Sequence, residues 1–194
     1  MRKKKYFQKL YNYNKENNAY LIEVSLDNYE EIYDDWDPSP FKKRDIESEF
    51  NDFVVNSSED IPLEYNIEVV LYLPEIKKDE KKESYLISAY KNYYNYEAER
   101  INKQKCALRN KTISHLFFSF ALLSLYFLWE VFSEDKGSFF MSFPLKEGIM
   151  IGGWVFLWEV FTNVFIKRKE IQTEYKRLKR LQETNIKFVY NNKG

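Results

Sequence analysis

The chain has 194 residues, and its 30 Lys and Arg are balanced by 30 Asp and Glu, so the formal net charge is zero. This length suits one compact domain with an added element and excludes a large multidomain enzyme. One Cys and one His are too few for a disulfide framework or for a zinc site of Cys and His ligands within one chain. The charge balance lacks the basic excess typical of nucleic-acid binders. We therefore expect no metal, no cofactor and no nucleic-acid partner.

Alternating apolar and polar side chains predict three β-strands. The alternation occurs at three places, which are residues 19–26, 65–73 and 186–190. It is the pattern of a strand with one buried face. Between the first two strands, Asp45 is placed to cap a helix. The apolar positions of this helix form one stripe, at Ile46, Phe50, Phe53 and Val54. The sequence thus predicts a strand–helix–strand unit, to which the third strand returns.

Two apolar runs predict transmembrane helices. Residues 113–132 contain only His115 and Glu130 as ionisable groups, and they are long enough to cross a hydrocarbon core of about 30 Å at 1.5 Å per residue. Residues 149–166 carry Glu159 and are slightly shorter, but a helix of this length still spans roughly 27 Å. Neither run has the polar stripe of a helix in a soluble core. We therefore expect both to cross a bilayer.

The distribution of Lys and Arg predicts the direction of insertion. The 15 residues before the first span hold five such residues, the 15 after the second span hold seven, and residues 133–148 between the spans hold two. The positive-inside rule then places both termini in the cytoplasm. The basic cluster in the first 14 residues is not followed by an apolar stretch, so it is not a signal peptide. The expected location is the cell (inner) membrane, with two spans.

The predicted fold is α+β, a small cytoplasmic α/β domain of about three strands and one or more covering helices, with an inserted two-helix transmembrane hairpin on long helical stalks. Residues 85–112 lack Gly and Pro, which favours a helix that runs straight into the first span. The expected segments are the first part of the α/β domain (1–84), a stalk (85–112), the first span (113–132), an extracytoplasmic loop (133–148), the second span (149–166), a second stalk (167–184) and the final strand (185–194).

A loop after the first strand is a candidate ligand site. Asp37 and Ser39 belong to a proline-rich turn that favours one rigid conformation. Lys42, Lys43 and Arg44 follow it, next to a predicted helix start whose free amides attract anions. The alternative interpretation is a packed loop without a ligand.

Four polar residues within the spans are a second candidate group. Glu159 lies roughly 10 Å inside the inner boundary, so we expect it to avoid lipid. Antiparallel packing places Ser119, His115 and Asn163 near its depth, and we expect hydrogen bonds among them. The alternative is that Glu159 extends toward the inner headgroups near Lys167.

Small residues in the second span predict close helix packing. Gly148 and Gly152 form a GxxxG pair that Gly153 extends, and such spacing lets helices approach closely in lipid. The expected partner is the first span or a neighbouring subunit.

Two short stretches resemble an uncharacterised family of bacterial two-span inner-membrane proteins. The first is the DPSPF sequence of residues 37–41, followed by Arg44 and Asp45. The second is Glu147 and Gly148, leading to the IGGWV sequence of residues 151–155 and then Trp158. The resemblance implies a cytoplasmic domain and a two-span hairpin, with no established activity. Where relatives continue with an Arg-Pro pair, this chain has Glu and Val at residues 159–160, so a role of that Arg does not carry over.

Three functional hypotheses follow. The first is a membrane-anchored, non-enzymatic sensor, adaptor or assembly protein, whose partners are the lipid bilayer and either further copies of itself or another membrane or cytoplasmic protein. The alternative is an oligomeric pore-forming or membrane-perturbing effector opened by a cytoplasmic signal. An enzyme that uses the carboxylates of Asp34, Asp35 and Asp37 to hold a hard metal ion is the least supported, because no catalytic partner is identifiable.

Overall fold

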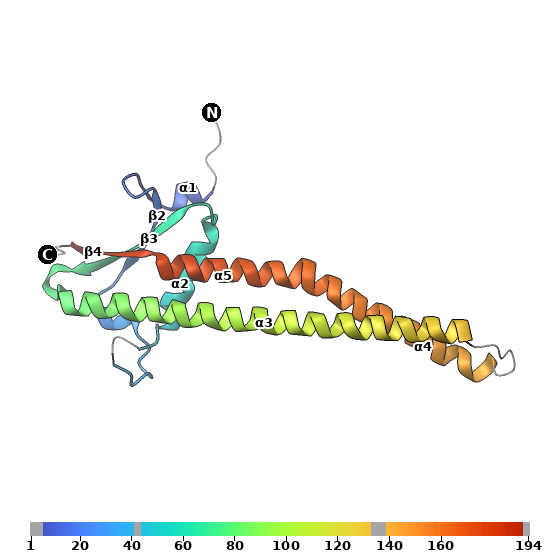
Figure 1. Ribbon diagram of the computed structural model, residues 1–194. Helices are drawn as coiled ribbons and strands as arrows, with labels where there is room; N and C mark the ends of the chain where they lie inside the picture. The colour runs from blue at the N-terminus through green and yellow to red at the C-terminus, as the bar shows by residue number, and fades with distance from the viewer. Residues whose placement is uncertain (1–5, 41–43, 133–138, 192–194) are drawn as a thin grey trace, which may run out of the picture. The chain divides into compact units, whose positions relative to one another are not determined.

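The computed structural model describes residues 6–40, 44–132 and 139–191, and it has the predicted α+β fold, a four-stranded mixed sheet with a short helix and two long helices (Figure 1). The chain forms two compact units. The sheet unit consists of Met1–Arg100 and Tyr175–Gly194, and the hairpin unit is Ile101–Glu174.

The sheet has the strand order β1-β2-β3-β4. Its members are β1 (Tyr13–Asn14), β2 (Ala19–Ser25), β3 (Asn66–Pro74) and β4 (Asn185–Asn191). The pairs β2–β3 and β3–β4 are parallel, and β1 pairs antiparallel with β2. The three predicted strands are confirmed, and the short β1 adds to them. Because β4 pairs with β3, chain segments before and after the apolar hairpin build one sheet, as predicted.

The core of the sheet unit lies between one face of the sheet and three helices. These are α2 (Ser48–Asp60), α3 (Glu80–Phe132) and α5 (Arg168–Glu183) (Figure 1). Alternate residues of the strands face this core because side chains along a strand point to opposite sides. The largest fully buried side chains include Ile22, Val69, Leu71, Leu73, Tyr90, Tyr94 and Leu181. The short α1 (Phe7–Leu10) adds Phe7 to the same cluster.

Helix α2 begins later than the sequence predicts, and its cap is Glu47 instead of Asp45. The Glu47 carboxylate accepts hydrogen bonds from the amides of Glu49 and Phe50, and these bonds lower the pKa of Glu47. Phe50 and Val54 are buried as expected, whereas Phe53 is 49% exposed.

The reason for the late start is a backbone contact made outside the helix. The Asp34 amide donates to the Asp45 carbonyl at 3.0 Å, and the Glu47 amide donates to the Ile32 carbonyl at 2.8 Å. Ile46 forms an antiparallel bridge with Tyr33. These bonds keep residues 45–47 extended, so the helix cannot include them.

The hairpin unit contains the C-terminal part of α3, then α4 (Phe139–Thr162), the π-helical turn η3 (Asn163–Lys167) and the start of α5. Helices over Glu80–Phe132 and Pro144–Glu183 are long and apolar enough to cross a membrane, and the apolar windows are only 6% and 11% buried. The predicted spans lie within them. Residues 139–148, expected as part of a loop, instead begin α4, which includes Pro144.

Candidate functional site

The predicted ligand loop around Asp37 is held by its own backbone. The Asp37 carboxylate accepts hydrogen bonds from the amides of Ser39 at 2.9 Å and Asp45 at 2.8 Å. Together with the Ser39 side chain, these bonds lower the pKa of Asp37. Asp37 therefore shapes the loop and has little capacity left for a ligand.

Of the three cations of that loop, the structure describes only Arg44. Lys42 and Lys43 lie outside the residues that the structure describes. Arg44 is half-buried near Tyr33, whose pKa is raised to about 12 by burial and by Glu30.

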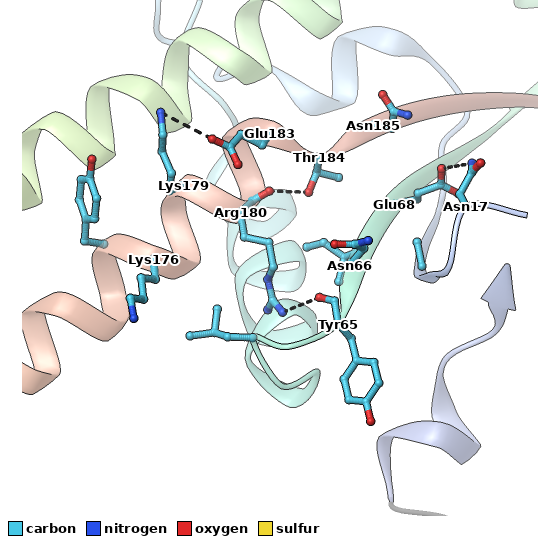
Figure 2. Close-up of a pocket in the computed structure, with 14 residues that line it drawn as sticks. Asn17, Tyr65, Asn66, Glu68, Lys176, Lys179, Arg180, Glu183, Thr184 and Asn185 are labelled. Carbon is cyan, nitrogen blue, oxygen red and sulfur yellow. Dashed lines mark hydrogen bonds and ion pairs between the residues drawn. The ribbon is translucent and has the colours of Figure 1, made fainter. Parts of the chain in front are cut away.

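A cleft of about 530 Å³ lies in the sheet unit, where β3 and β4 begin (Figure 2). Its walls come from the β1–β2 turn, the start of β3, the end of α5 and the start of β4. The cleft lies at the amino ends of these strands, whereas ligands of parallel sheets usually bind beyond the carboxyl ends. At the carboxyl ends of β2, β3 and β4, the pocket has a volume of about 110 Å³, which is much smaller than the cleft. The cleft is therefore the candidate functional site.

Arg180 of α5 forms one wall of the cleft and ties α5 to the segment that follows α2. Its Nη1 donates to the carbonyl of Tyr65 at 3.3 Å (Figure 2). Nη1 also donates to the carbonyls of Ile61 and Pro62 at 3.1 and 3.0 Å, and Nη2 donates to the carbonyl and hydroxyl of Ser58. Burial and the nearby Arg177 lower the pKa of Arg180 to about 10, so the guanidinium stays charged at neutral pH. With these five acceptors, Arg180 holds α5 against the end of α2 and the segment that follows it.

Glu68 of β3 is the second charged group of the cleft, and both of its carboxylate oxygens accept hydrogen bonds. Its carboxylate accepts a hydrogen bond from Asn17 (Figure 2). It also accepts from Asn14 and from Lys187, each at 3.2 Å. These bonds link β1, β3 and β4 across the sheet face that α2, α3 and α5 leave uncovered. On the same face, Glu23 accepts from Tyr72 at 2.6 Å. Leu21, Val70 and Val189 lie on the same face, so hydrogen-bonded polar groups alternate there with apolar side chains.

The cleft retains a few polar groups without partners. Lys179 is bonded to Gln182 at 2.7 Å and lies 3.9 Å from Glu183. The side chains of Lys176, Asn66 and Asn185 have no hydrogen bond or ion pair to any residue that the structure describes. One ammonium and two amides can thus bind a polar ligand. Within the described ranges, no three His, Cys, Asp or Glu residues lie close enough to hold a metal ion.

Sequence reasoning did not select Arg180 or Glu68. Arg180 is one of seven Lys and Arg residues within 15 positions, and nothing local distinguishes it. Glu68 was expected on the polar side of its strand, but its partners come from distant segments. A single sequence holds no signal for these contacts.

The polar residues of the two predicted spans make other contacts than the group expected around Glu159. Glu159 lies 3.6 Å from Lys167, and its side chain is 40% exposed. The Ser119 hydroxyl instead donates to the Gly153 carbonyl at 3.0 Å, which joins α3 to α4. The His115 ring packs edge-on against Phe156. Among the described residues, Glu159 makes no hydrogen bond to Ser119, His115 or Asn163, and its contact is with Lys167, as in the alternative expectation.

Glu159→Gln and Glu159→Leu are both expected to change the stability of the hairpin by no more than about 1 kcal/mol, because Glu159 makes no hydrogen bond to a described residue and its ion pair with Lys167 is long, at 3.6 Å. Thermal unfolding of the purified full chain in detergent, followed by helical circular dichroism, measures this. A loss of more than about 2 kcal/mol of stability in the Leu variant would indicate that Glu159 does belong to a buried hydrogen-bond network.

The three glycines differ in how closely α3 approaches them. A Cβ on Gly153 would lie 2.8 Å from two side-chain carbons of Leu123, and one on Gly152 would lie 3.4 Å from Leu122. A Cβ on Gly148 would have no neighbour within 4 Å. Close packing therefore centres on Gly153, and the Gly148 end of the predicted GxxxG pair has no close contact in the described part of the chain.

Comparison with protein-family models, with curated proteins and with solved structures finds no match. The resemblance to two-span inner-membrane proteins stays a prediction. The function must therefore be argued from the residues themselves.

Proposed function

We propose that this chain is a membrane-anchored, non-enzymatic sensor, adaptor or assembly protein of the cell (inner) membrane. The hairpin unit anchors it with two spans, both termini lie in the cytoplasm, and the sheet unit binds a ligand or a protein partner there. Its partners are the lipid bilayer and either further copies of the chain or another protein.

The observation that carries this proposal is the exposure of the two apolar helices. Large side chains along both spans are exposed, among them Phe117, Phe120, Trp154 and Trp158 at 58% to 73%. Soluble proteins rarely expose apolar patches on this scale, and such patches mark membrane or protein contacts. The Lys and Arg residues that flank the spans on one side favour the cytoplasmic placement of the sheet unit.

The cleft of the sheet unit supports a binding role over a chemical one. Two of its charged side chains, Arg180 and Glu68, form hydrogen bonds that hold secondary-structure elements together. The groups that remain, Lys176 with Asn66 and Asn185, can hold a polar or anionic ligand but form no pair of nucleophile and base. We therefore assign ligand or partner binding to this cleft.

The native cysteine provides the test of topology. Cys106 is exposed, lies just before the first span and is the chain's single Cys. In intact spheroplasts, an impermeant maleimide is expected to leave Cys106 unlabelled and to label it after permeabilisation. A Cys106→Ser, Ser138→Cys variant should show the reverse accessibility, with labelling in intact spheroplasts. Labelling of Cys106 from outside would overturn the proposed orientation.

Measuring ion flux distinguishes the proposed sensor or adaptor from the alternative, an oligomeric pore. Vesicles that contain the purified protein are expected to hold an ion gradient as well as empty vesicles do. A protein-dependent leak would instead support an oligomeric pore.

A further inference from the structure

A second cavity lies wholly within the hairpin unit, where α3 passes η3 and the start of α5. Its volume is about 430 Å³. It is lined by residues just before the first predicted span and by residues at the end of the second. In a membrane, both sets would lie at the depth of the inner headgroups.

The charged groups of this cavity are all cationic. Lys105, Arg109 and Arg168 line it, and no Asp or Glu of the described residues does so. None of the three cations has an ion pair with a residue that the structure describes. Three uncompensated positive charges around one cavity attract an anion, and Arg binds phosphate oxygens in a bidentate manner.

Asn163 gives an independent indication that a ligand is missing. It lines the same cavity and is only 1% exposed. Neither Oδ1 nor Nδ2 of its side chain has a hydrogen-bond partner among the described residues. Buried amides are normally satisfied, because an unpaired one costs free energy. Asn163 also begins the π-helical turn η3, and such turns occur frequently at functional sites.

The apolar part of the lining narrows the chemistry of the ligand. Leu108, Ile113, Val164 and Ile171 form the rest of the wall beside the cations. A free phosphate would leave this apolar surface unused, whereas the glycerol and acyl carbons of a phospholipid would cover it. Nδ2 of Asn163 can donate to a phosphate oxygen, while Oδ1 can accept from a headgroup hydroxyl.

We propose that this cavity binds a glycerol phosphate group, supplied by an anionic phospholipid with a hydroxyl-bearing headgroup. Basic pockets between transmembrane helices on the cytoplasmic side are suited to anionic headgroups. The lipid source rests on the proposed membrane anchoring, whereas the phosphate chemistry does not. Such a site would make the cytoplasmic boundary of the hairpin selective for lipid charge.

Cys106 lines the cavity and is exposed, so it reports occupancy directly. The full chain in detergent micelles is treated with a maleimide while phosphatidylglycerol, zwitterionic phosphatidylcholine or soluble sn-glycerol 3-phosphate is added. Phosphatidylglycerol is expected to slow the labelling of Cys106 and to raise the unfolding temperature, and phosphatidylcholine is expected to do neither. Protection by glycerol 3-phosphate as strong as that by the lipid would support the phosphate site and assign it a soluble ligand.

Two matched double variants distinguish binding in the cavity from the general attraction of anionic lipid to basic residues. Arg109→Gln with Arg168→Gln removes two cations from the cavity, and the phosphatidylglycerol concentration for half protection should rise about tenfold or more. Lys111→Gln with Lys169→Gln removes two charges from the same helices outside the cavity lining and should raise that concentration far less. Equal effects in the two variants, or no protection of the native chain by any of the phosphates, would overturn the proposal.

Asn163→Leu provides a second test of the cavity, which can be used if the double arginine variant folds poorly. Leu removes the unpaired amide, so the variant without lipid should be at least as stable as the native chain while losing the response to phosphatidylglycerol. An undiminished lipid response would contradict the role of Asn163. The proposed topology is tested separately, by Cys106 labelling in spheroplasts without added lipid. A failure of the lipid site can therefore be distinguished from a failure of the topology.

Discussion

Replacing Arg180 by Met is expected to lower the free energy of unfolding of the sheet unit by about 3 kcal/mol. The Met side chain keeps part of the apolar stem but removes every donor to Ser58, Ile61 and Tyr65. Ser58 and Ile61 are each 1% exposed, so water does not readily replace those bonds. Each buried polar group left unpaired costs about 1 to 3 kcal/mol, and bonds to a charged donor lie at the upper end.

Arg177→Met is the matched control, because Arg177 lies one turn earlier on the same helix. Arg177 makes a single ion pair with Glu59 at 2.7 Å, and both side chains are partly exposed. Such a pair contributes about 0.2 to 1 kcal/mol. Chemical denaturation of the full chain in detergent, followed by far-ultraviolet circular dichroism, compares the two variants. Equal losses for both variants would show that Arg180 is an ordinary surface cation.

Arg180→Lys should fall between the native chain and Arg180→Met. A Lys ammonium keeps the charge but presents a compact group without the planar fork of donors. It cannot reach the carbonyls of Ile61, Pro62 and Tyr65 and also the Ser58 hydroxyl with one nitrogen. Full stability in the Lys variant would mean that charge alone, and not the fork, holds α5 in place.

The strands could be predicted from the sequence because each has one buried and one polar face. Ile22, Val69 and Ile186 occupy neighbouring positions on the inner face of β2, β3 and β4, and each belongs to an alternating run. That β4 pairs with one of the upstream strands was also predictable, because a lone strand is not stable in water, but its pairing with β3 was not. Their parallel direction required the structure.

The start of α2 shows where local signals fail. Asp45 is a preferred cap residue, but its carbonyl is held by Asp34 and its amide by Asp37. Contacts made by residues 32–37 thus decide where the helix begins. A capping rule that considers only neighbouring residues cannot include them.

The orientation of Glu159 depends on a backbone feature that hydropathy does not reveal. An α-helix rotates about 100° per residue, so eight residues would leave Lys167 about 80° away from Glu159 around the axis. The π-helical turn at Asn163–Lys167 holds extra backbone in one turn and reduces that offset. It also places Asn163 in the interior, where it is 1% exposed. The sequence alone does not show which side of the helix each of these polar residues occupies.

Gly153→Ala is expected to destabilise the packing of α3 on α4 by roughly 1 to 3 kcal/mol, the usual cost of overpacking. The added Cβ would lie 2.8 Å from both Cγ and Cδ2 of Leu123, and Cγ cannot move away without the rest of the side chain. The Ser119 bond to the Gly153 carbonyl holds the helices together at the same level, so separating them would also break a buried hydrogen bond. Thermal unfolding of the helical signal in detergent measures the loss.

The neighbouring glycines supply controls that isolate this contact from helix propensity. Ala favours a helix over Gly by about 1 kcal/mol, so Gly148→Ala, with open space around its Cβ, should be neutral or stabilising. Gly152→Ala meets Leu122 at 3.4 Å and should cost far less than Gly153→Ala. Leu123→Ala removes the atoms that clash, so in a double-mutant cycle it should recover part of the Gly153→Ala loss. Equal responses of the three glycine variants, or strict additivity in the cycle, would mean that Gly153 is not where the two helices approach most closely.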